Sequence, residues 1–206
     1  VPHLICGGWS KYDIEDSLID MDFLGLHNVL ALRGDKRQNE PRFVPYAQGH
    51  AHAADLVRQI QAMNRGEFID GEVEECHHSK FSVGVAGYPE KHFEAANPQS
   101  DLQYLKEKVD AGADYIVTQM FFDNSKYFDF VETPKHLEIL PRTFSVSLPE
   151  ELVKAVRACG EDTQAAREVG IEWAIHQAKE LKAAGVPIIH FYTMGRTDNI
   201  RKIARN

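Results

Sequence analysis

A helix, a glycine and a buried strand follow one another in the segment Val109-Asp110-Ala111-Gly112-Ala113-Asp114-Tyr115-Ile116-Val117-Thr118-Gln119. Glycine ends helices readily because it adopts a left-handed backbone conformation without steric cost. The same junction, with an apolar run after the glycine, recurs at Gly25 and Gly185. This repetition predicts strand and helix units arranged around a parallel sheet.

Short apolar runs predict the strands of this sheet, at residues 2–6, 28–32, 81–86, 115–120 and 187–192. Amphipathic periodicity between them predicts helices at residues 13–24, 46–63, 100–109, 126–132 and 163–184. Ser100 and Asp101 are suitable N-cap residues for the third of these helices.

The fold that we expect is α/β, as a (β/α)8 TIM-type barrel. A doubly wound sheet is the alternative, but no GxGxxG follows any strand to favour its dinucleotide-binding form. A complete barrel takes about 250 residues and eight strands. The 206 residues contain fewer runs, so we expect a single, incomplete domain over residues 1–206. The missing parts are expected before Val1 and between Glu132 and Thr133, where a helix stops without a cap.

Composition excludes several classes of partner. The formal net charge of -8 argues against a nucleic-acid surface, which usually needs a clustered basic face. No run approaches the ~20 apolar residues of a membrane span. Cys6, Cys76 and Cys159 lack metal-binding spacing, which indicates reduced thiols in the cytoplasm. The segment Cys76-His77-His78 is more typical of a solvated acidic insertion than of a metal site, so no metal is expected.

Polar residues follow each predicted strand, and in a parallel barrel these strand ends meet on one face. The second run leads into Arg33-Gly34-Asp35, the third into residues 87–92, and the fourth carries Gln119. Each has two interpretations. Arg33-Gly34-Asp35 is either a solvated loop or a contact to a flat ring. Residues 88–95 are either a structured turn or a cofactor diphosphate site. Gln119 either has its amide hydrogen-bonded within the protein or recognises a ligand.

The motifs identify a family when they are taken in order. They are residues 30–35 (LALRGD), 85–92 (VAGYPEKH), 106–108 (KEK), 110–114 (DAGAD), 118–123 (TQMFFD), 170–174 (GIEWA) and 190–196 (HFYTMGR). Their sequence and spacing resemble methylenetetrahydrofolate reductases over nearly the whole chain. An unrelated flavin barrel, such as one like proline dehydrogenase, would explain the architecture but not the ordered motifs.

The resemblance implies a barrel whose strands one, two and seven are absent here, and it implies an FAD site. Its cofactor-binding residues would be His3, Arg33, Gly34, Asp35, Tyr46, Ala47, Tyr88, His92, Phe93, Glu94, Ala95, Asp101 and Lys108. Phe93 departs from the proline that many relatives have after the histidine. The folate-binding residues would be Asp35, Gln119, Tyr192 and Arg196, with Leu140 as an apolar wall, and Asp35 would lie close to both ligands.

The chemistry implied by the resemblance is a ping-pong hydride transfer from NADPH or NADH through FAD to 5,10-methylenetetrahydrofolate. The catalytic residue assigned within this sequence is Asp35. The family's general acid, a glutamate at the end of strand one, is expected outside it. The acidic insertion, residues 67–80, and residues 169–173 resemble the eukaryotic branch, which generally uses NADPH and carries an S-adenosylmethionine-sensing domain. A homo-oligomer is expected, and that C-terminal domain is one way to form it. The rival hypothesis is a catalytically silent barrel that binds FAD or folate and serves as a scaffold.

Overall fold

A computed structural model describes residues 1–72, 78–132, 147–191 and 197–205. The chain divides into two compact units, which are described separately below. The first comprises Val1–Gly87 and Gln99–Gln119, and the second comprises Tyr88–Pro98 and Met120–Asn206. The expectation of a single domain stays a prediction.

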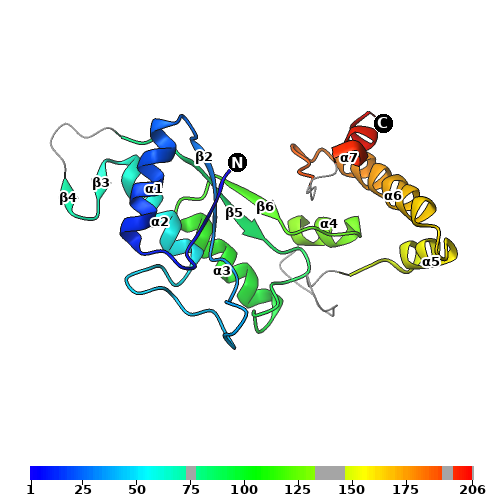
Figure 1. Cartoon of the computed structure of the whole chain (residues 1–206), viewed down its shortest axis with the longest axis horizontal. Helices are drawn as coiled ribbons and strands as arrows, with labels where there is room; N and C mark the ends of the chain where they lie inside the picture. The colour runs from blue at the N-terminus through cyan, green and yellow to red at the C-terminus, as the bar shows by residue number, and fades with distance from the viewer. Residues whose placement is uncertain (73–77, 133–146, 192–196, 206) are drawn as a thin grey trace. The chain divides into compact units, whose positions relative to one another are not determined.

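The first unit is built on a parallel four-stranded sheet (Figure 1). Its strands are β1 (His3–Ile5), β2 (Asn28–Leu32), β5 (Ser82–Gly87) and β6 (Tyr115–Thr118), and their spatial order is β1-β2-β5-β6. Each strand therefore lies beside its predecessor in the sheet, and the order never reverses. A doubly wound sheet reverses direction at a switch point, and these four strands have none.

Two helices pack against one face of this sheet: α1 (Lys11–Phe23) and α2 (Ala53–Asn64). Alternate strand residues face them because side chains in a strand alternate between its two faces. The resulting core contains Leu4, Cys6, Val29, Ala31, Val83 and Val85 from the strands and Ile14, Leu18, Leu56, Val57, Ile60 and Met63 from the helices. Leu105 of α3 (Pro98–Asp110) packs against the same cluster.

The helix-glycine junctions are confirmed at all three positions, because Gly25, Gly112 and Gly185 have φ of 72°, 108° and 82°. At Gly112 the space is restricted as well. A Cβ there would lie 2.8 Å from Cγ of Gln61, whose Nε2 donates a 2.7 Å hydrogen bond to the Gly112 carbonyl. The turn at Gly112 is therefore held against α2 by this hydrogen bond and by close packing.

The predicted strand at residues 187–192 is wrong over the residues that the structure describes. Residues 187–191 form no strand, and Ile188 is 82% exposed. An apolar run becomes a strand only when a neighbouring strand supplies its ladder hydrogen bonds, and this run is not part of the four-stranded sheet.

Two predicted helix starts also need correction. Helix α2 begins at Ala53 rather than residue 46. Residues between the two points are not helical, because Gln48 has φ of 58° and Gly49 packs so tightly on the Trp9 carbonyl that it has no room for a side chain. Helix α3 begins at Pro98, so Ser100 and Asp101 lie in its first turn and are not N-caps.

The acidic insertion contains a small antiparallel hairpin of β3 (Glu67–Phe68) and β4 (Gly71–Glu72). The Ile69 backbone N–H donates a 2.9 Å hydrogen bond to Glu15 of α1, which holds the turn. Cys76 and His77 lie outside the described residues, and His78 is exposed. Among the residues that the structure describes, no group of His, Cys, Asp and Glu is arranged to hold a metal ion.

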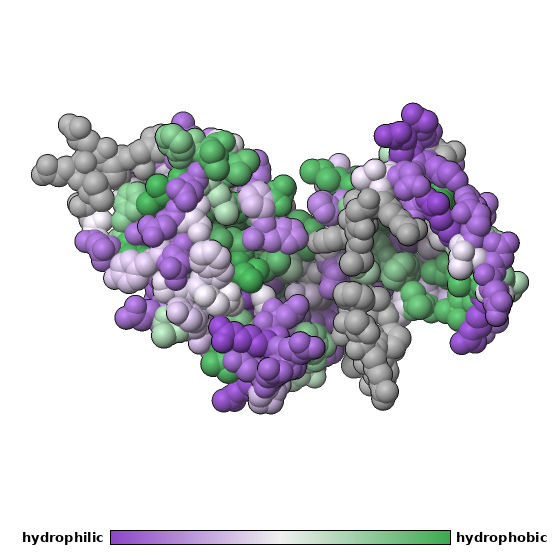
Figure 2. Space-filling view, viewed as in Figure 1, coloured by the Kyte–Doolittle hydropathy of each residue, from purple (hydrophilic) through white to green (hydrophobic). Residues whose placement is uncertain are grey.

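Apolar side chains are exposed near the end of α1, where the chain turns toward β2. Ile19, Phe23, Leu24 and Leu26 are 46%, 90%, 68% and 45% exposed. Figure 2 shows apolar surface at this end of the unit. Within the described ranges, no helix is long and apolar enough to cross a membrane.

The second unit is helical. It contains α4 (Asn124–Glu132), α5 (Glu150–Ala158), α6 (Thr163–Ala183) and α7 (Thr197–Ala204), of which α5 and α7 were not predicted. Asp162 caps α6 by accepting 3.0 Å hydrogen bonds from the backbone of Gln164 and Ala165. The predicted break after Glu132 lies at the limit of the described residues.

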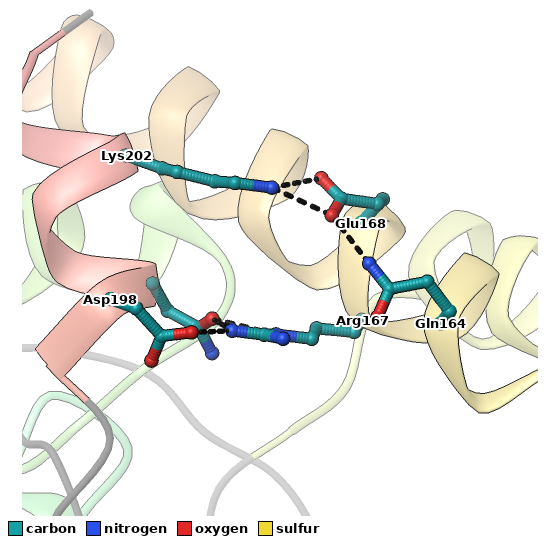
Figure 3. A network of polar contacts seen from close by, with 6 residues as sticks. Gln164, Arg167, Glu168, Asp198 and Lys202 are labelled. Atoms are coloured by element: carbon teal, nitrogen blue, oxygen red, sulfur yellow. Dashed lines mark hydrogen bonds and ion pairs between the residues drawn. The ribbon is translucent and has the colours of Figure 1, made fainter.

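Helices α6 and α7 are joined by a polar network (Figure 3). Lys202 Nζ lies 2.7 and 3.0 Å from the two carboxylate oxygens of Glu168, and Arg167 binds Asp198 and Asn199. Gln164 adds a 2.9 Å hydrogen bond to Glu168.

Candidate functional site

Arg33, Gly34 and Asp35 follow β2 directly and form a turn with a defined backbone. Gly34 has φ of 83°, and a Cβ there would lie 3.4 Å from Ile5 of β1, so a side chain would strain this turn. The Arg33 guanidinium lies over the Phe43 ring, 4.8 Å from its centroid, and its Nε donates a 3.3 Å hydrogen bond to the Gly34 carbonyl. Arg33 is thus half-buried and oriented, whereas Asp35 is exposed.

Two predicted ligand-binding residues are attached to the carboxyl end of β5. Lys108 Nζ donates a 2.5 Å hydrogen bond to the Ala86 carbonyl, and the Gln119 backbone N–H donates a 2.7 Å hydrogen bond to the Gly87 carbonyl. Gln119 is therefore aligned one residue beyond β6 and is partly buried. Lys108 from α3 and Gln119 from the β6 end approach adjacent peptide groups of one strand.

The Lys108 ammonium is held in a low-polarity environment. Burial lowers the pKa of Lys108, and the nearby Asp101 carboxylate opposes that shift. Asp101 is itself 9% exposed, so a buried carboxylate accompanies the buried ammonium. An ammonium carries three N–H groups, so a lysine can donate to more than one acceptor at the same time.

Residues 88–95 form a compact aromatic turn in the second unit. The His92 ring lies edge-on to Tyr88, with centroids 4.6 Å apart, and 4.7 Å from the Phe93 ring. Lys91, with φ of 73°, closes the turn through Nζ hydrogen bonds of 3.0 and 2.7 Å to the carbonyls of His92 and Ala95. Ala95 is buried, while Phe93 is 56% exposed.

Contacts between three further pairs of residues anchor this unit's loops. The Glu90 carboxylate accepts 2.8 and 2.9 Å hydrogen bonds from the Ser147 backbone N–H and a 2.5 Å bond from its hydroxyl. Glu90 is thus engaged in holding the segment before α5. On α6, Trp173 Nε1 donates a 2.9 Å hydrogen bond to the Phe122 carbonyl, and Gln177 Nε2 donates a 3.4 Å bond to the Phe121 carbonyl.

Comparison with known proteins gives a direct assignment. The family model described as methylenetetrahydrofolate reductase matches residues 1–139 and 131–206. The chain belongs to the methylenetetrahydrofolate reductase family. It is 32% identical to the probable methylenetetrahydrofolate reductase (NADH) of rice over 99% of this chain and 37% of that protein.

Other family members extend this comparison. The chain is 34% identical to methylenetetrahydrofolate reductase (NADH) 1 of Arabidopsis thaliana, over 93% of this chain and 35% of the relative. It is 30% identical to the 5,10-methylenetetrahydrofolate reductase of Pectobacterium carotovorum, over 96% and 65%. The chain therefore spans about a third of the length of these plant relatives.

The structure brings together some of the residues predicted from the methylenetetrahydrofolate reductase motifs. In the first unit, the ends of adjacent strands are followed or contacted by Arg33 to Asp35, Lys108 and Gln119. Asp101 interacts electrostatically with Lys108. His3 begins β1, opposite Leu30, and is exposed. Tyr46 and Ala47 are exposed in the segment before α2. In the second unit, Tyr88 and residues 92–95 share one turn, while Tyr192, Arg196 and Leu140 lie outside the described residues.

Sequence reasoning missed two residues that shape these turns. Phe43 supports the Arg33 guanidinium, and Lys91 closes the turn at residues 91–95. Phe43 could have been noticed as an aromatic residue in the loop that follows Arg33-Gly34-Asp35. Lys91 stands inside a motif of the methylenetetrahydrofolate reductase family, but nothing local indicates that its ammonium bonds to the backbone.

Proposed function

We propose that this chain is the catalytic part of a flavin-dependent oxidoreductase that reduces 5,10-methylenetetrahydrofolate to 5-methyltetrahydrofolate. The observation that carries the proposal is the family match across both residues 1–139 and 131–206. The electron donor is NADPH or NADH. The eukaryotic character of the sequence favours NADPH, whereas the rice relative is named for NADH and a Caenorhabditis elegans relative for NADPH.

A (β/α)8 barrel is the architecture proposed for the complete catalytic domain. The unreversed order of four parallel strands supports it, since each barrel strand lies beside the one before it. The face of the sheet opposite the helices also supports it. There Ile5 is 36% exposed and Leu32 only half-buried, which suits a surface that further strands would enclose.

FAD is the proposed cofactor. The side chains fit its chemistry. Arg33 and Lys108 offer cationic donors for a diphosphate or an electron-rich ring edge, and Tyr88, His92 and Phe93 offer aromatic surface for stacking. When bound, FAD accepts hydride from the nicotinamide and passes it to the folate methylene carbon, which predicts ping-pong kinetics.

The folate is proposed to contact Asp35 and Gln119 among the described residues, with Tyr192 and Arg196 as further contacts. The Gln119 amide matches the paired donor and acceptor edge of a pterin, and its backbone is held in place by Gly87. Opening of the folate imidazolidine ring generates a cationic iminium, and the Asp35 carboxylate is suited to stabilise that charge. The general acid that protonates the departing nitrogen is proposed to lie outside residues 1–206.

The direct test is an assay of the full-length protein. We expect it to take up FAD, to oxidise NADPH or NADH, and to convert 5,10-methylenetetrahydrofolate to 5-methyltetrahydrofolate as identified by mass spectrometry. FAD uptake without turnover of either donor would support the silent-scaffold hypothesis instead. Failure to bind FAD at all would overturn the proposal.

Assembly and location are proposed with the function. We propose a cytoplasmic homo-oligomer, which light scattering coupled to size exclusion and imaging of a tagged full-length protein would test. A monomeric mass at micromolar concentration would contradict the assembly.

A further inference from the structure

The segment between β2 and α2 is held in place by a polar network around one buried histidine, and no proposed ligand contact uses this network. His50 is 6% exposed, although a histidine side chain is seldom fully buried without a partner. Its Nε2 lies 2.5 Å from Oε1 of Gln59 on α2. The Gln59 amide in turn donates a 2.8 Å hydrogen bond from Nε2 to the Lys11 carbonyl at the start of α1.

The orientation of the Gln59 amide defines the role of each atom. Because its NH2 group faces the Lys11 carbonyl, its oxygen faces His50, and His50 therefore donates through Nε2–H. Burial lowers the pKa of His50, the Gln59 acceptor and Asp55 oppose this, and Lys11 reinforces it. The neutral imidazole supplies the donor that this arrangement needs.

Backbone contacts complete the attachment. The Lys11 N–H donates a 3.1 Å hydrogen bond to the Gln48 carbonyl, and the Gly49 N–H donates a 2.8 Å bond to the Tyr46 carbonyl. Gly49 packs directly on the Trp9 carbonyl, where any side chain would collide. Gln48 itself adopts φ of 58°, which costs energy for a non-glycine residue unless its surroundings enforce it.

We infer that His50 and Gln59 are positioning residues that hold residues 46–50 in the conformation that binds the flavin. The inference rests on the proposed function, because Tyr46 and Ala47 are proposed FAD contacts. Both side chains are exposed, so packing of the side chains themselves does little to hold them in place. The placement of Tyr46 and Ala47 therefore depends on the backbone of residues 46–50, which His50, Gln59 and Lys11 hold in place.

The chain offers a matched pair of variants on α2. Gln59→Ala removes two hydrogen bonds to the segment and to α1, whereas Asn64→Ala removes 2.9 and 2.8 Å bonds to the Phe81 backbone at the other end of the same helix. Both variants remove the amide of a half-buried side chain, so they should lose similar stability. Only Gln59→Ala loosens residues 46–50.

The experiment is an FAD titration of the full-length apoprotein, followed by flavin fluorescence, together with amide exchange at Gly49. We expect Gln59→Ala to raise the FAD dissociation constant roughly fivefold to tenfold and to speed Gly49 exchange, and Asn64→Ala to change neither by more than about twofold. His50→Leu should match Gln59→Ala, while His50→Gln, which keeps a donor at the Nε2 position, should restore most of the affinity.

Two outcomes overturn the inference. One is equal loss of FAD affinity in Gln59→Ala and Asn64→Ala, which would reduce the network to general stability. The other is unchanged Gly49 exchange in Gln59→Ala and His50→Leu. A wild-type protein that binds no FAD would overturn the proposed function, and with it the role of the network in flavin binding. Even then, the Gly49 exchange measurement would decide whether His50 and Gln59 hold residues 46–50.

Discussion

Gly84 of β5 lies opposite Tyr115 of β6, and the ring of that tyrosine occupies the space that a side chain at Gly84 would need. The Tyr115 hydroxyl continues across β5 and donates a 3.2 Å hydrogen bond to the Val29 carbonyl of β2. One side chain thus ties three strands together. Burial raises the pKa of Tyr115, so the hydroxyl keeps its proton at neutral pH.

Gly84→Ala should destabilise the protein by roughly 1 to 3 kcal/mol, because the added methyl overpacks against the Tyr115 ring. Urea unfolding of the variant and the wild type measures the difference. Gly170→Ala is the control, since a Cβ at that helical position meets nothing within 4 Å. It should stabilise by about 0.5 to 1 kcal/mol. A neutral Gly84→Ala would show that Tyr115 moves aside freely.

Gln119→Ala should slow the folate half-reaction while leaving nicotinamide oxidation nearly unchanged. The amide is proposed to recognise the pterin, and loss of such a hydrogen bond typically costs ~1 to 3 kcal/mol. Stopped-flow measurement of each half-reaction on FAD-saturated protein separates the two steps. Equal losses in both would assign Gln119 to the flavin or to the fold.

Asp35→Asn should make FAD easier to reduce and slow hydride delivery to the folate. A carboxylate near the flavin disfavours added negative charge there, but it stabilises a cationic folate. The flavin midpoint potential and the folate half-reaction are the two measurements. If both stay at wild-type values, Asp35 has only the structural role of completing the turn after Gly34.

Helix α6 is the element that organises the second unit. Its Trp173 and Gln177 bind the Phe122 and Phe121 carbonyls, and Asn124 donates a 2.6 Å hydrogen bond to Glu180 on the same helix. Asn124 is 5% exposed, so this is a buried attachment and not a surface contact. The segment after Gln119 is thereby fixed to a long helix, although the sequence places about fifty residues between them.

The ion pairs between α6 and α7 should make the attachment of α7 sensitive to acid and to salt. The Lys202 partner lowers the pKa of Glu168, and the Arg167 partner lowers the pKa of Asp198. A carboxyl whose folded-state pKa is depressed contributes fully above its unfolded pKa of about 4, and the contribution is lost as pH falls through the lower folded value. Amide exchange over residues 197–204, corrected for the pH dependence of intrinsic exchange, should therefore lose protection below that range.

Lys202→Gln should speed the same exchange at pH 7 by less than about fivefold, because exposed ion pairs are weak and salt screens them. Lys179→Gln, which lies on α6 but outside this network, is the control. Identical exchange in the two variants would show that the network does not hold α7.

At the scale of the whole molecule, β1 is an edge strand of the sheet within the part of the chain that the structure describes. The bonds from the Leu30 N–H to the Pro2 carbonyl, at 2.9 Å, and from the Cys6 N–H to the Leu32 carbonyl, at 3.1 Å, point toward β2. Since successive residues of a strand alternate in direction, the N–H groups of His3 and Ile5 point to the other side. A closed barrel would pair them with another strand.

In the full-length protein, the amides of His3 and Ile5 should exchange as slowly as that of Leu4, which faces β2. Mass spectrometry with single-residue resolution, or NMR of labelled protein, measures the three rates. Exchange of His3 and Ile5 at least tenfold faster than Leu4 would mean that the sheet stays open at this edge, contrary to the proposed barrel.

Local sequence was sufficient for those parts of the molecule whose conformation depends on near neighbours. The runs around Asn28–Leu32 and Tyr115–Thr118 became strands, and Gly25, Gly112 and Gly185 took the left-handed conformation that ends a helix. The ordered motifs were also sufficient to identify the family, because they lie along the chain and require no contact to be known.

Tertiary structure decided what depends on distant partners. Residues 46–52 carry a helical pattern but are held out of the helix by Trp9 and Lys11, and residues 187–191 carry a strand pattern but do not join the sheet. Likewise, only packing brings Lys108 to the Ala86 carbonyl and Trp173 to Phe122. The periodicity of apolar residues in the sequence indicates which side chains can be buried on one face of an element. The partner that satisfies each backbone group or charge lies elsewhere in the chain, and the folded structure alone selects it.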